Sequence, residues 1–432
     1  MKNKRSARKN LVSYIGLFSW ILALALICFI VLTVIPQGSK KKPEVNTSKP
    51  KETVSQFKET TATVVNIGDI MVHSPQLKGA YVASKDEYDF SPFFKEVSPY
   101  FKNSDLAVGN LEVTFGGSEW GKYTGYPAFN CPDSLADAIK NSGLNLLLTA
   151  NNHSYDTGFH GLKRTVNVLK SRQLDFVGTK ETLQDPSYLV KNVNNINIGI
   201  ADYTYETSGE LADRKYLNGA IINKEANDYI NSFSYDRIED FFVDAKNTVD
   251  SMKKDGAEYI VFYLHWGNEY KTKESIHQQR IAQRLCDIGV DMIIGGHPHV
   301  IEPIDLLTSS DGKHNTVCLY SLGNAVSNQR QEIMDSCPTG HTEDGMIFEF
   351  TLKKTQKGVS LHSMDLTPTW VNKYVGGGGW QYTIYPLDSE IDSKLSAQAL
   401  EKAKKSYERT KAIVAQGLTK CQEAIGCEIT FK

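Results

Sequence analysis

The sequence predicts an α/β fold for the central part of the chain, residues 62–370. Three observations favour this fold: short apolar runs rich in β-branched and aromatic residues, amphipathic stretches between those runs, and a glycine at the end of two of the stretches. Such an alternation of strands and helices is typical of layered α/β domains whose strands are buried on both faces. The chain has 432 residues, of which 41% are hydrophobic, so it is long enough for one large domain with extensions.

The expected elements follow one another in a regular order. Apolar runs predict strands over residues 63–71, 105–113, 144–151, 196–204, 258–265, 290–296 and 316–323. Amphipathic stretches predict helices over residues 134–143, 161–173 and 274–289. Two later runs, 345–354 and 358–366, predict antiparallel strands that close the domain.

A C-terminal extension is predicted over residues 371–432. The run GGGG at 376–379 indicates a flexible break. Residues 389–416 are rich in strong helix formers and predict one long surface helix, an appendage whose role the sequence does not indicate.

Residues 11–35 contain no charged residue and predict a transmembrane helix. At about 1.5 Å per residue, a helix of this length exceeds the ~30 Å hydrocarbon core of a bilayer. The alternatives are a buried core helix and a cleaved signal peptide. The absence of charge on any face argues against a core helix, and the lack of a small-residue cleavage site argues against a cleaved signal peptide, so an uncleaved anchor is favoured. The basic tail, residues 1–10, favours a single-pass protein of the cell membrane with its domain outside, although lysines also follow the span. The polar residues 36–61 predict a flexible tether.

The distribution of charge excludes nucleic acid as a partner. The formal net charge of the chain is −2, and five of the 48 basic residues lie in the first ten positions. The remainder therefore has 43 basic residues against 50 acidic ones, without the clustered basic face that a nucleic-acid-binding domain needs.

The seven cysteines give no metal-binding or redox motif, because no CxxC sequence occurs. Cys131, Cys286 and Cys318 lie in apolar contexts typical of buried thiols. Cys421 and Cys427 are close enough in sequence to pair, but the sequence leaves their pairing open.

Polar side chains of metal-binding or acid–base type stand at the ends of six predicted strands. They are Asp69, Glu112, Asn152, His153, His265, His297, His299 and Asn324. Because ligand sites in α/β folds lie outside the carboxyl ends of the strands, we expect these residues to share one site. A mixture of imidazole, carboxylate and amide donors suits one or two divalent ions such as Mn²⁺, Zn²⁺ or Fe²⁺ rather than a soft thiolate site.

The sequence HPH at 297–299 indicates that the site could hold two ions. In a strand, residues i and i+2 point to the same side and lie about 6.5–7 Å apart, which is wide for one ion but suits two ions ~3.5–4 Å apart. Pro298 fixes φ between the histidines and is expected to stiffen this arrangement.

Six motifs occur in a fixed order over residues 63–327: GDIM, NLE, ANNHSYDTG, HWGNEY, GGHPH and YSLGN. This set resembles the CapA family, the capsule-synthesis proteins associated with poly-γ-glutamate, which in turn resembles the calcineurin-like metallophosphoesterases. The resemblance implies a four-layered α-β-β-α sandwich with a binuclear metal centre. It also implies a membrane-anchored, outward-facing protein that acts on poly-γ-glutamate, an anionic polymer, together with other capsule synthase subunits.

The resemblance implies a role for each motif residue. The metal ligands would be Asp69, Glu112 as the bridging carboxylate, Asn152, His265, His297 and His299. His153 would protonate the leaving group, and Asp156 could orient its imidazole, as acid–base histidines generally require. Substrate contacts are expected from Trp266, Glu269 and Asn324, although Trp266 could equally be a core residue and Glu269 an exposed, solvated one.

Two departures from the phosphoesterase pattern leave the function open. Asp69 is followed by Ile70, and the next histidine is His73, where that family has Asp-x-His; Glu112 also stands where aspartate is usual. The protein could therefore be a metal-dependent hydrolase of the polymer, a non-catalytic polymer-binding and assembly factor, or a metallophosphoesterase of another substrate.

Overall fold

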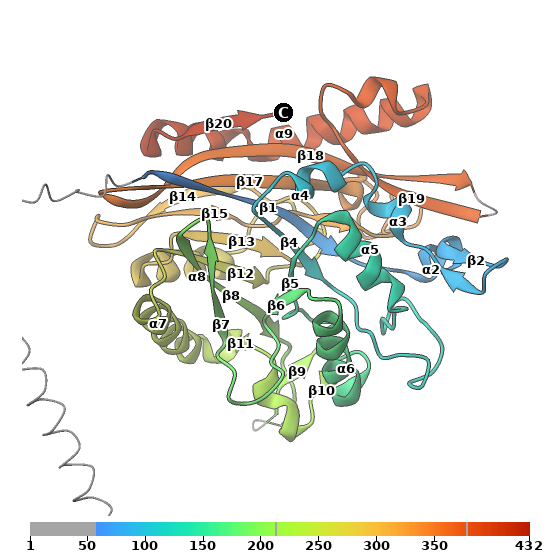
Figure 1. Cartoon of the computed structure of the whole chain (residues 1–432), viewed down its shortest axis with the longest axis horizontal. Coiled ribbons are helices and arrows are strands. Elements are labelled where there is room, and N and C mark those ends of the chain that lie inside the picture. Colours follow the sequence, from blue (N-terminus) through green and yellow to red (C-terminus); the bar gives the residue numbers. More distant parts are fainter. Residues whose placement is uncertain (1–57, 212–213, 377–378) are drawn as a thin grey trace, which may run out of the picture. The chain divides into compact units, whose positions relative to one another are not determined.

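Two mixed β-sheets form the centre of the protein in a computed structural model that describes residues 58–211, 214–376 and 379–432 (Figure 1). The predicted tail, the predicted anchor at 11–35 and most of the predicted tether lie outside the described residues. Within the described ranges, no helix is both long enough and apolar enough to cross a bilayer. The predicted α/β class is confirmed.

The first sheet combines parallel strands with a long antiparallel meander. Its order is β19 (Gly379–Pro386), β18 (Gly358–Gly376), β17 (Asp344–Thr355), β1 (Thr60–Ile70), β4 (Leu106–Leu111), β5 (Leu146–Leu148) and β6 (Asp175–Val177). Two further strands join it, β16 (Asn324–Val326) beside β1 and β20 (Glu428–Phe431) beside β18. Strands β1, β4, β5 and β6 are parallel, so their carboxyl ends meet at one edge of the sheet.

The second sheet is also mainly parallel. Its order is β11 (Ser232–Ser234), β8 (Ile196–Glu206), β12 (Tyr259–His265), β13 (Met292–Gly296), β15 (Asn315–Leu319) and β14 (Ile304–Thr308), with β7 (Tyr188–Val193) antiparallel to β8. Short hairpins, β2 (Tyr81–Val82) with β3 (Glu87–Tyr88) and β9 (Tyr216–Leu217) with β10 (Ala220–Ile221), lie apart from both sheets.

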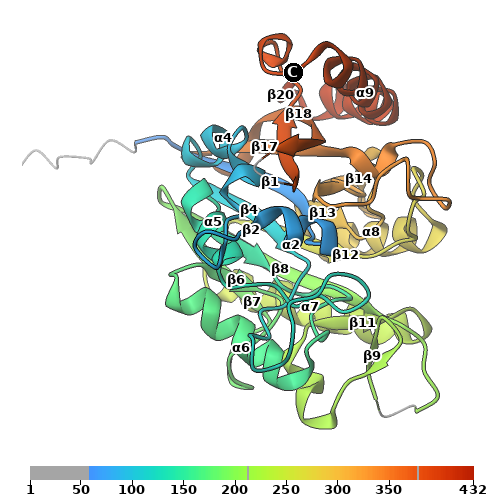
Figure 2. The same cartoon turned by 90° about the vertical axis from the view of Figure 1, so that its right-hand side faces the viewer.

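Most helices cover the outer faces of the two sheets, whereas the C-terminal helix adds apolar side chains to the core between the sheets (Figures 1 and 2). Along the chain they are α2 (Ser74–Ala80), α3 (Ser91–Phe94), α4 (Ser98–Lys102), α5 (Ser134–Ser142), α6 (Gly158–Ser171), α7 (Ile238–Lys254), α8 (Ile276–Ile288) and α9 (Ala397–Ile425). Short 3₁₀ turns occupy Lys224–Tyr229, Tyr235–Arg237, His341–Glu343 and Ile391–Ser393. Helices α5 and α8 end at Gly143 and Gly289, both in the left-handed conformation that glycine adopts without strain.

Three apolar cores separate the layers. Side chains of both sheets, among them Val64 and Val261, pack together between the sheets. Successive residues of a strand face opposite sides, so Val65 packs instead against α3, α4 and α5, and Phe262 against α7 and α8. The central strands are therefore apolar on both faces, which is why they read as continuous apolar runs in the sequence.

The C-terminal segment belongs to the same compact unit as the sheets. Strand β18 runs through the boundary expected at residue 370, and β19 and β20 both pair with it. Helix α9 begins at Ala397, after Ser396 caps its first turn, and continues to Ile425, so it starts and ends later than predicted. It packs on β14 and β18, with Val414 buried and Gly417 so close that a Cβ there would lie 1.8 Å from the Ile304 carbonyl oxygen.

Candidate metal centre

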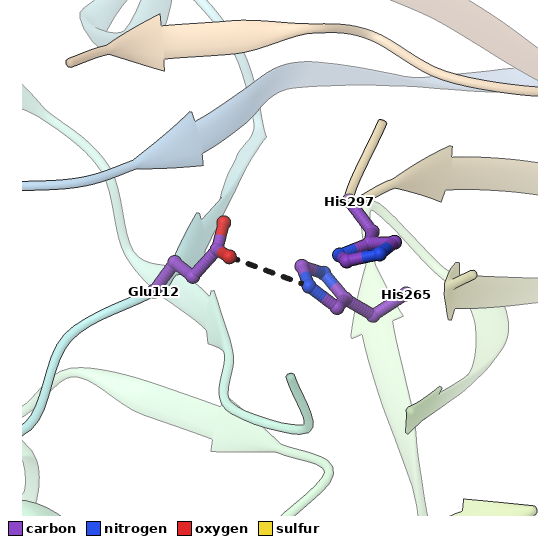
Figure 3. Close-up of side chains that lie close together, drawn as sticks. All are labelled: Glu112, His265 and His297. Carbon is purple, nitrogen blue, oxygen red and sulfur yellow. Dashed lines mark ion pairs between the residues drawn. The ribbon is translucent and has the colours of Figure 1, made fainter. Parts of the chain in front are cut away.

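The carboxyl ends of four parallel strands bring the predicted ligands together between the two sheets. Asp69 lies at the end of β1, Glu112 directly follows β4, His265 ends β12, and His297 directly follows β13. All four side chains are at most 3% exposed. Figure 3 shows Glu112 from one sheet pointing toward His265 and His297 from the other.

Close packing of glycines makes this meeting possible. Strand β1 has a register irregularity next to Gly68, where a Cβ would lie 1.9 Å from the carbonyl oxygen of Gly323. A Cβ on Gly296 would lie 2.7 Å from Asp69 Oδ1. Larger residues at either position would displace the Asp69 carboxylate, because bulges and close backbone contacts set the direction in which a side chain points.

Glu112 occupies the centre of the cluster. Its Oε1 lies 3.4 Å from His265 Nε2 and 3.8 Å from His299 Nε2. His299 Nδ1 is also 3.3 Å from Asp69 Oδ2. Two buried groups of potential ligands, Glu112–His265–His297 and Asp69–Glu112–His299, share the Glu112 carboxylate. Each of these groups could hold an ion, and either ion would use the Glu112 carboxylate.

Several polar atoms of the cluster have no hydrogen-bond partner in the described part of the chain. Both carboxylate oxygens of Glu112 and Nδ1 of His297 are buried in this state. A buried polar group without a partner costs about 1–3 kcal/mol, and more if it is charged. A divalent cation would accept these lone pairs, and the mixed N and O donors fit such an ion.

The protonation states also favour a cation. Burial, followed by the neighbouring imidazoles of His265 and His299, holds the pKa of His297 well below its usual range, so its ring is neutral and can bind a metal. Burial raises the pKa of Asp69, but the hydrogen bond from His299 and the imidazole charges outweigh this and keep the pKa below its usual value. Burial lowers the pKa of His299, while Glu112 and Asp69 raise it more, to about 9. The proton on His299 therefore balances the carboxylates, and a bound cation would replace it.

The HPH segment does not have the expected strand geometry. Strand β13 ends at Gly296, and His297 and His299 have φ values of 93° and 58°. The strand geometry expected for this pair is therefore wrong. The two rings lie in different fully buried ligand groups, but a third group, with Glu269, contains both. A positive φ in a residue with a side chain costs of order 1–3 kcal/mol and is typical of functional sites.

Asn152 and Asn110 extend the cluster. Asn152 Oδ1 lies 2.8 Å from His265 Nε2, which makes it an additional oxygen donor beside the Glu112 group. Asn110, which the sequence analysis did not single out, donates to Asp69 Oδ1 at 2.8 Å and accepts from Asn151 at 3.1 Å. The sequence position of Asn110, two residues before Glu112, could have predicted its place in the cluster, since residues i and i+2 of a strand share a face.

His153 and Asp156 form a buried pair beside the cluster. His153 Nδ1 is 2.8 Å from Asp156 Oδ2, and this oxygen also accepts the Phe129 backbone N–H at 2.7 Å. The Phe129 ring packs on the His153 ring with 4.7 Å between centroids. Burial lowers the pKa of His153, but Asp156 raises it above its usual value. Because Nδ1 is held by Asp156, Nε2 is the ring nitrogen that remains for proton transfer to a substrate.

The remaining predicted residues have different surroundings. Trp266 is fully buried and donates to the Tyr320 carbonyl at 2.9 Å, the position of a core side chain. Asn324 is fully buried and lies 3.1 Å from His299 Nδ1, so it holds this imidazole. Glu269 is exposed and forms a third potential ligand group with His297 and His299.

His73 takes no part in the three ligand groups of the described residues. Its backbone N–H and its ring both contact Gln76 at the start of α2, and its Nδ1 accepts from the Asn328 backbone N–H at 3.3 Å. Two tyrosines that were not among the expected site residues line the cluster: the Tyr205 ring centre lies 4.7 Å from that of His297, and the Tyr270 ring centre lies 6.1 Å from that of His299. Tyr270 is the last residue of the HWGNEY motif, which was a signal for it, whereas Tyr205 comes from β8 and belongs to none of the six motifs.

The fold and this cluster define a mixed α/β protein with a buried group of side chains able to hold a divalent ion. Comparison with known proteins identifies its family: residues 63–329, more than half of the chain, match the family described as "Bacterial capsule synthesis protein PGA_cap", and the chain belongs to it. The predicted membership of the CapA family is thus confirmed.

Two relatives support this assignment. The chain is 30% identical over 272 residues to the capsule biosynthesis protein CapA of Bacillus anthracis, a match that covers 62% of this chain and 60% of that protein. It is 25% identical over 363 residues to the PGA biosynthesis protein CapA of Bacillus subtilis (strain 168), covering 82% of each. Among solved structures, TT1561 of Thermus thermophilus aligns over 67% of this chain and 94% of that one, with a TM-score of 0.33 and 9% identity. This TM-score is too low to assign a fold.

Proposed function

We propose that this protein acts in the synthesis, export or processing of capsular poly-γ-glutamate, and that the cluster around Glu112 is a divalent-metal site that hydrolyses the polymer or a linked intermediate. The names of the two Bacillus relatives and the family description support the role in capsule biosynthesis. The carboxylate of Glu112 carries the proposal of a metal site, because both its oxygens are buried without a hydrogen-bond partner in the described residues, between His265 and His299.

The proposed location is the outer face of the cell membrane. The uncharged residues 11–35 would anchor the chain, and the polar residues that follow would hold the α/β unit away from the bilayer. The order of layers, helices on the outside of two packed sheets, supports the metallophosphoesterase-type sandwich that the resemblance implies. Other capsule synthase subunits are the partners that such a location favours.

In the proposed reaction, the residues of this chain perform three tasks. Asp69, Glu112, Asn152, His265, His297 and His299 would hold the metal, with Glu269 at the exposed side. A bound divalent ion supplies Lewis acidity and lowers the pKa of a water molecule. His153, whose ring Asp156 orients and whose pKa Asp156 raises, donates a proton to the leaving amine or alkoxide. Asn110 and Asn324 fix the candidate ligands Asp69 and His299.

A second candidate function is non-catalytic binding of the polymer within the synthase complex. The observation that favours it is the position of His73, which caps α2 and belongs to none of the described ligand groups. The group around Asp69 therefore lacks the histidine of the phosphoesterase pattern and offers fewer donors.

The deciding experiment compares polymer hydrolysis by the full-length protein and by His153→Ala, with Mn²⁺ or Zn²⁺ added. The hydrolase proposal predicts that the polymer shortens and that His153→Ala lowers the rate by about 10²–10⁴. His160→Ala, which changes an exposed histidine of α6, is the matched control and should keep the rate. A polymer that binds but is never shortened would favour the second function.

A further inference from the structure

A second cavity, of about 350 Å³, lies at the carboxyl ends of β8 and β11. None of the residues that line it is a candidate metal ligand. Glu206 lines this cavity, whereas its neighbour in β8, Tyr205, contacts His297, so the cavity and the metal centre are adjacent but separate. Its size is within the range of small-molecule sites, roughly 300–1,000 Å³.

A partly buried lysine with weak partners lines the cavity. Lys215 Nζ lies 3.8 Å from Glu206 Oε1 and 3.5 Å from the Ile230 carbonyl oxygen, both at or beyond the limit of a hydrogen bond. The Lys215 side chain is only 22% exposed. Burial lowers its pKa, against the opposing effect of Glu206 and other nearby acids. Glu206 already accepts from Ser232 Oγ at 2.8 Å, so the ammonium group has unused donor capacity.

Acidic and basic side chains together line the rest of the cavity, which also includes Lys180 and Arg237, the latter 3.5 Å from Glu206 Oε2. Asp228, Asp240 and Asp244 all line it and are exposed. In the described part of the chain none of the three forms an ion pair; Asp244 accepts one hydrogen bond, from the Tyr203 hydroxyl at 2.8 Å. The cavity therefore presents both cationic groups and carboxylates without an ion-pair partner among the described residues, an arrangement complementary to a ligand with a carboxylate and an ammonium group close together.

We propose that this cavity binds an α-amino-acid head group, with the α-carboxylate on Lys215 and the α-ammonium among Asp228, Asp240 and Asp244. The choice of ligand rests on the proposed function: the amino-terminal residue of a γ-linked glutamyl chain, or free glutamate. In a γ-linked chain the side-chain carboxyl forms the peptide bond, so every residue keeps its α-carboxylate. Only the amino-terminal residue also keeps an ammonium group. The cavity thus recognises the end of the polymer rather than its interior.

The test is calorimetric titration of the full-length protein in mild detergent, with EDTA present so that the metal centre does not contribute. The probes are a γ-linked triglutamate, the same peptide acetylated at its amino terminus, and free glutamate. We expect the free peptide to bind and acetylation to weaken binding by about tenfold or more, because the ammonium charge is lost. Peptide binding tighter than that of glutamate assigns the site to the polymer end, and equal binding assigns it to the free amino acid.

Variants locate the binding. Lys215→Met should weaken peptide binding by about tenfold or more, whereas Lys313→Met, which changes a lysine that is 82% exposed elsewhere, should not change it. If Lys215→Met fails to fold, Asp240→Asn changes an exposed lining residue and serves as the second variant. Equal binding of the acetylated peptide, or unchanged binding in the folded cavity variants, would overturn the proposal. Glu112→Gln should leave this binding intact, so loss of polymer hydrolysis and loss of end binding are separable results.

Discussion

Replacement of Glu112 by glutamine gives the sharpest prediction about the metal centre. The substitution keeps the shape of the side chain and removes one negative charge. In metal-free protein two effects oppose each other: the variant loses the attraction to the ring nitrogens of His265 and His299 at 3.4 and 3.8 Å, but it also removes a buried carboxylate whose oxygens have no described partner. We therefore expect the free energy of unfolding without metal to change by no more than about 1–2 kcal/mol.

With metal, the two proteins should differ strongly. An ion at 1,000 times its dissociation constant stabilises the native state by about 4 kcal/mol, which is a rise of about 8 °C in Tm at roughly 2 °C per kcal/mol. We expect Glu112→Gln to lose most of this rise, because both buried ligand groups share its carboxylate.

The assay is thermal unfolding with EDTA and with Mn²⁺ or Zn²⁺, followed by circular dichroism. Glu349→Gln, a partly buried glutamate of β17, is the matched control and should keep the metal-induced rise in Tm. If Glu112→Gln shows the same metal-induced rise as the unmodified chain, Glu112 is not a ligand and the reasoning from its unpaired oxygens is refuted.

Three further predictions concern the residues around the site. Asn110→Ala should weaken metal affinity by about 10–100-fold, measured by competition with a chelating dye, because Asn110 holds the Asp69 carboxylate; an unchanged affinity would remove Asn110 from the site. Glu302 is 1% exposed, and burial raises its pKa from 4.5 to about 8, so the folded state keeps a proton that the unfolded state releases. The free energy of unfolding should therefore fall by up to about 5 kcal/mol as the pH rises from 4.5 to 8. Urea unfolding of Glu302→Gln should depend less on pH, and an equally steep dependence would contradict this assignment. Arg409→Met should lower the free energy of unfolding in urea by about 3 kcal/mol, because the buried Asp344 loses the two hydrogen bonds that Arg409 donates to it at 2.7 and 2.6 Å. A loss below about 1 kcal/mol would show that α9 is anchored by its apolar contacts alone.

The elements that the sequence predicted best are those with a strong local signal. The strands β1, β4, β8, β12 and β13 read as apolar runs because each is buried on both faces. Candidate ligands stand at the ends of β1, β4, β12 and β13, because strand ends are where the chain leaves the core. Asp69, Glu112, His265, His297 and His299 were therefore identifiable as one cluster before the fold was known.

Features that depend on contacts distant in sequence were not predictable in the same way. The left-handed backbone of His297 and His299 follows from the packing around Asp69 and Asn324, and nothing in the letters HPH indicates it. Helix α9 is amphipathic like a surface helix, but its burial against β14 and β18 depends on strand pairings more than 50 residues away. The six described cysteines are all buried and free, so Cys421 and Cys427 are not paired.

The central claim, that the cluster around Glu112 holds a divalent cation, is tested most directly by counting bound metal. Full-length protein exchanged into buffer with Mn²⁺ or Zn²⁺ and freed of excess ion should carry at least one ion per chain by elemental mass spectrometry. A variant with both Glu112→Gln and His299→Ala, which together remove a ligand from each of the three described groups, should carry none while it still unfolds cooperatively. Metal-free native protein, or an equal metal content in the double variant, would contradict the account.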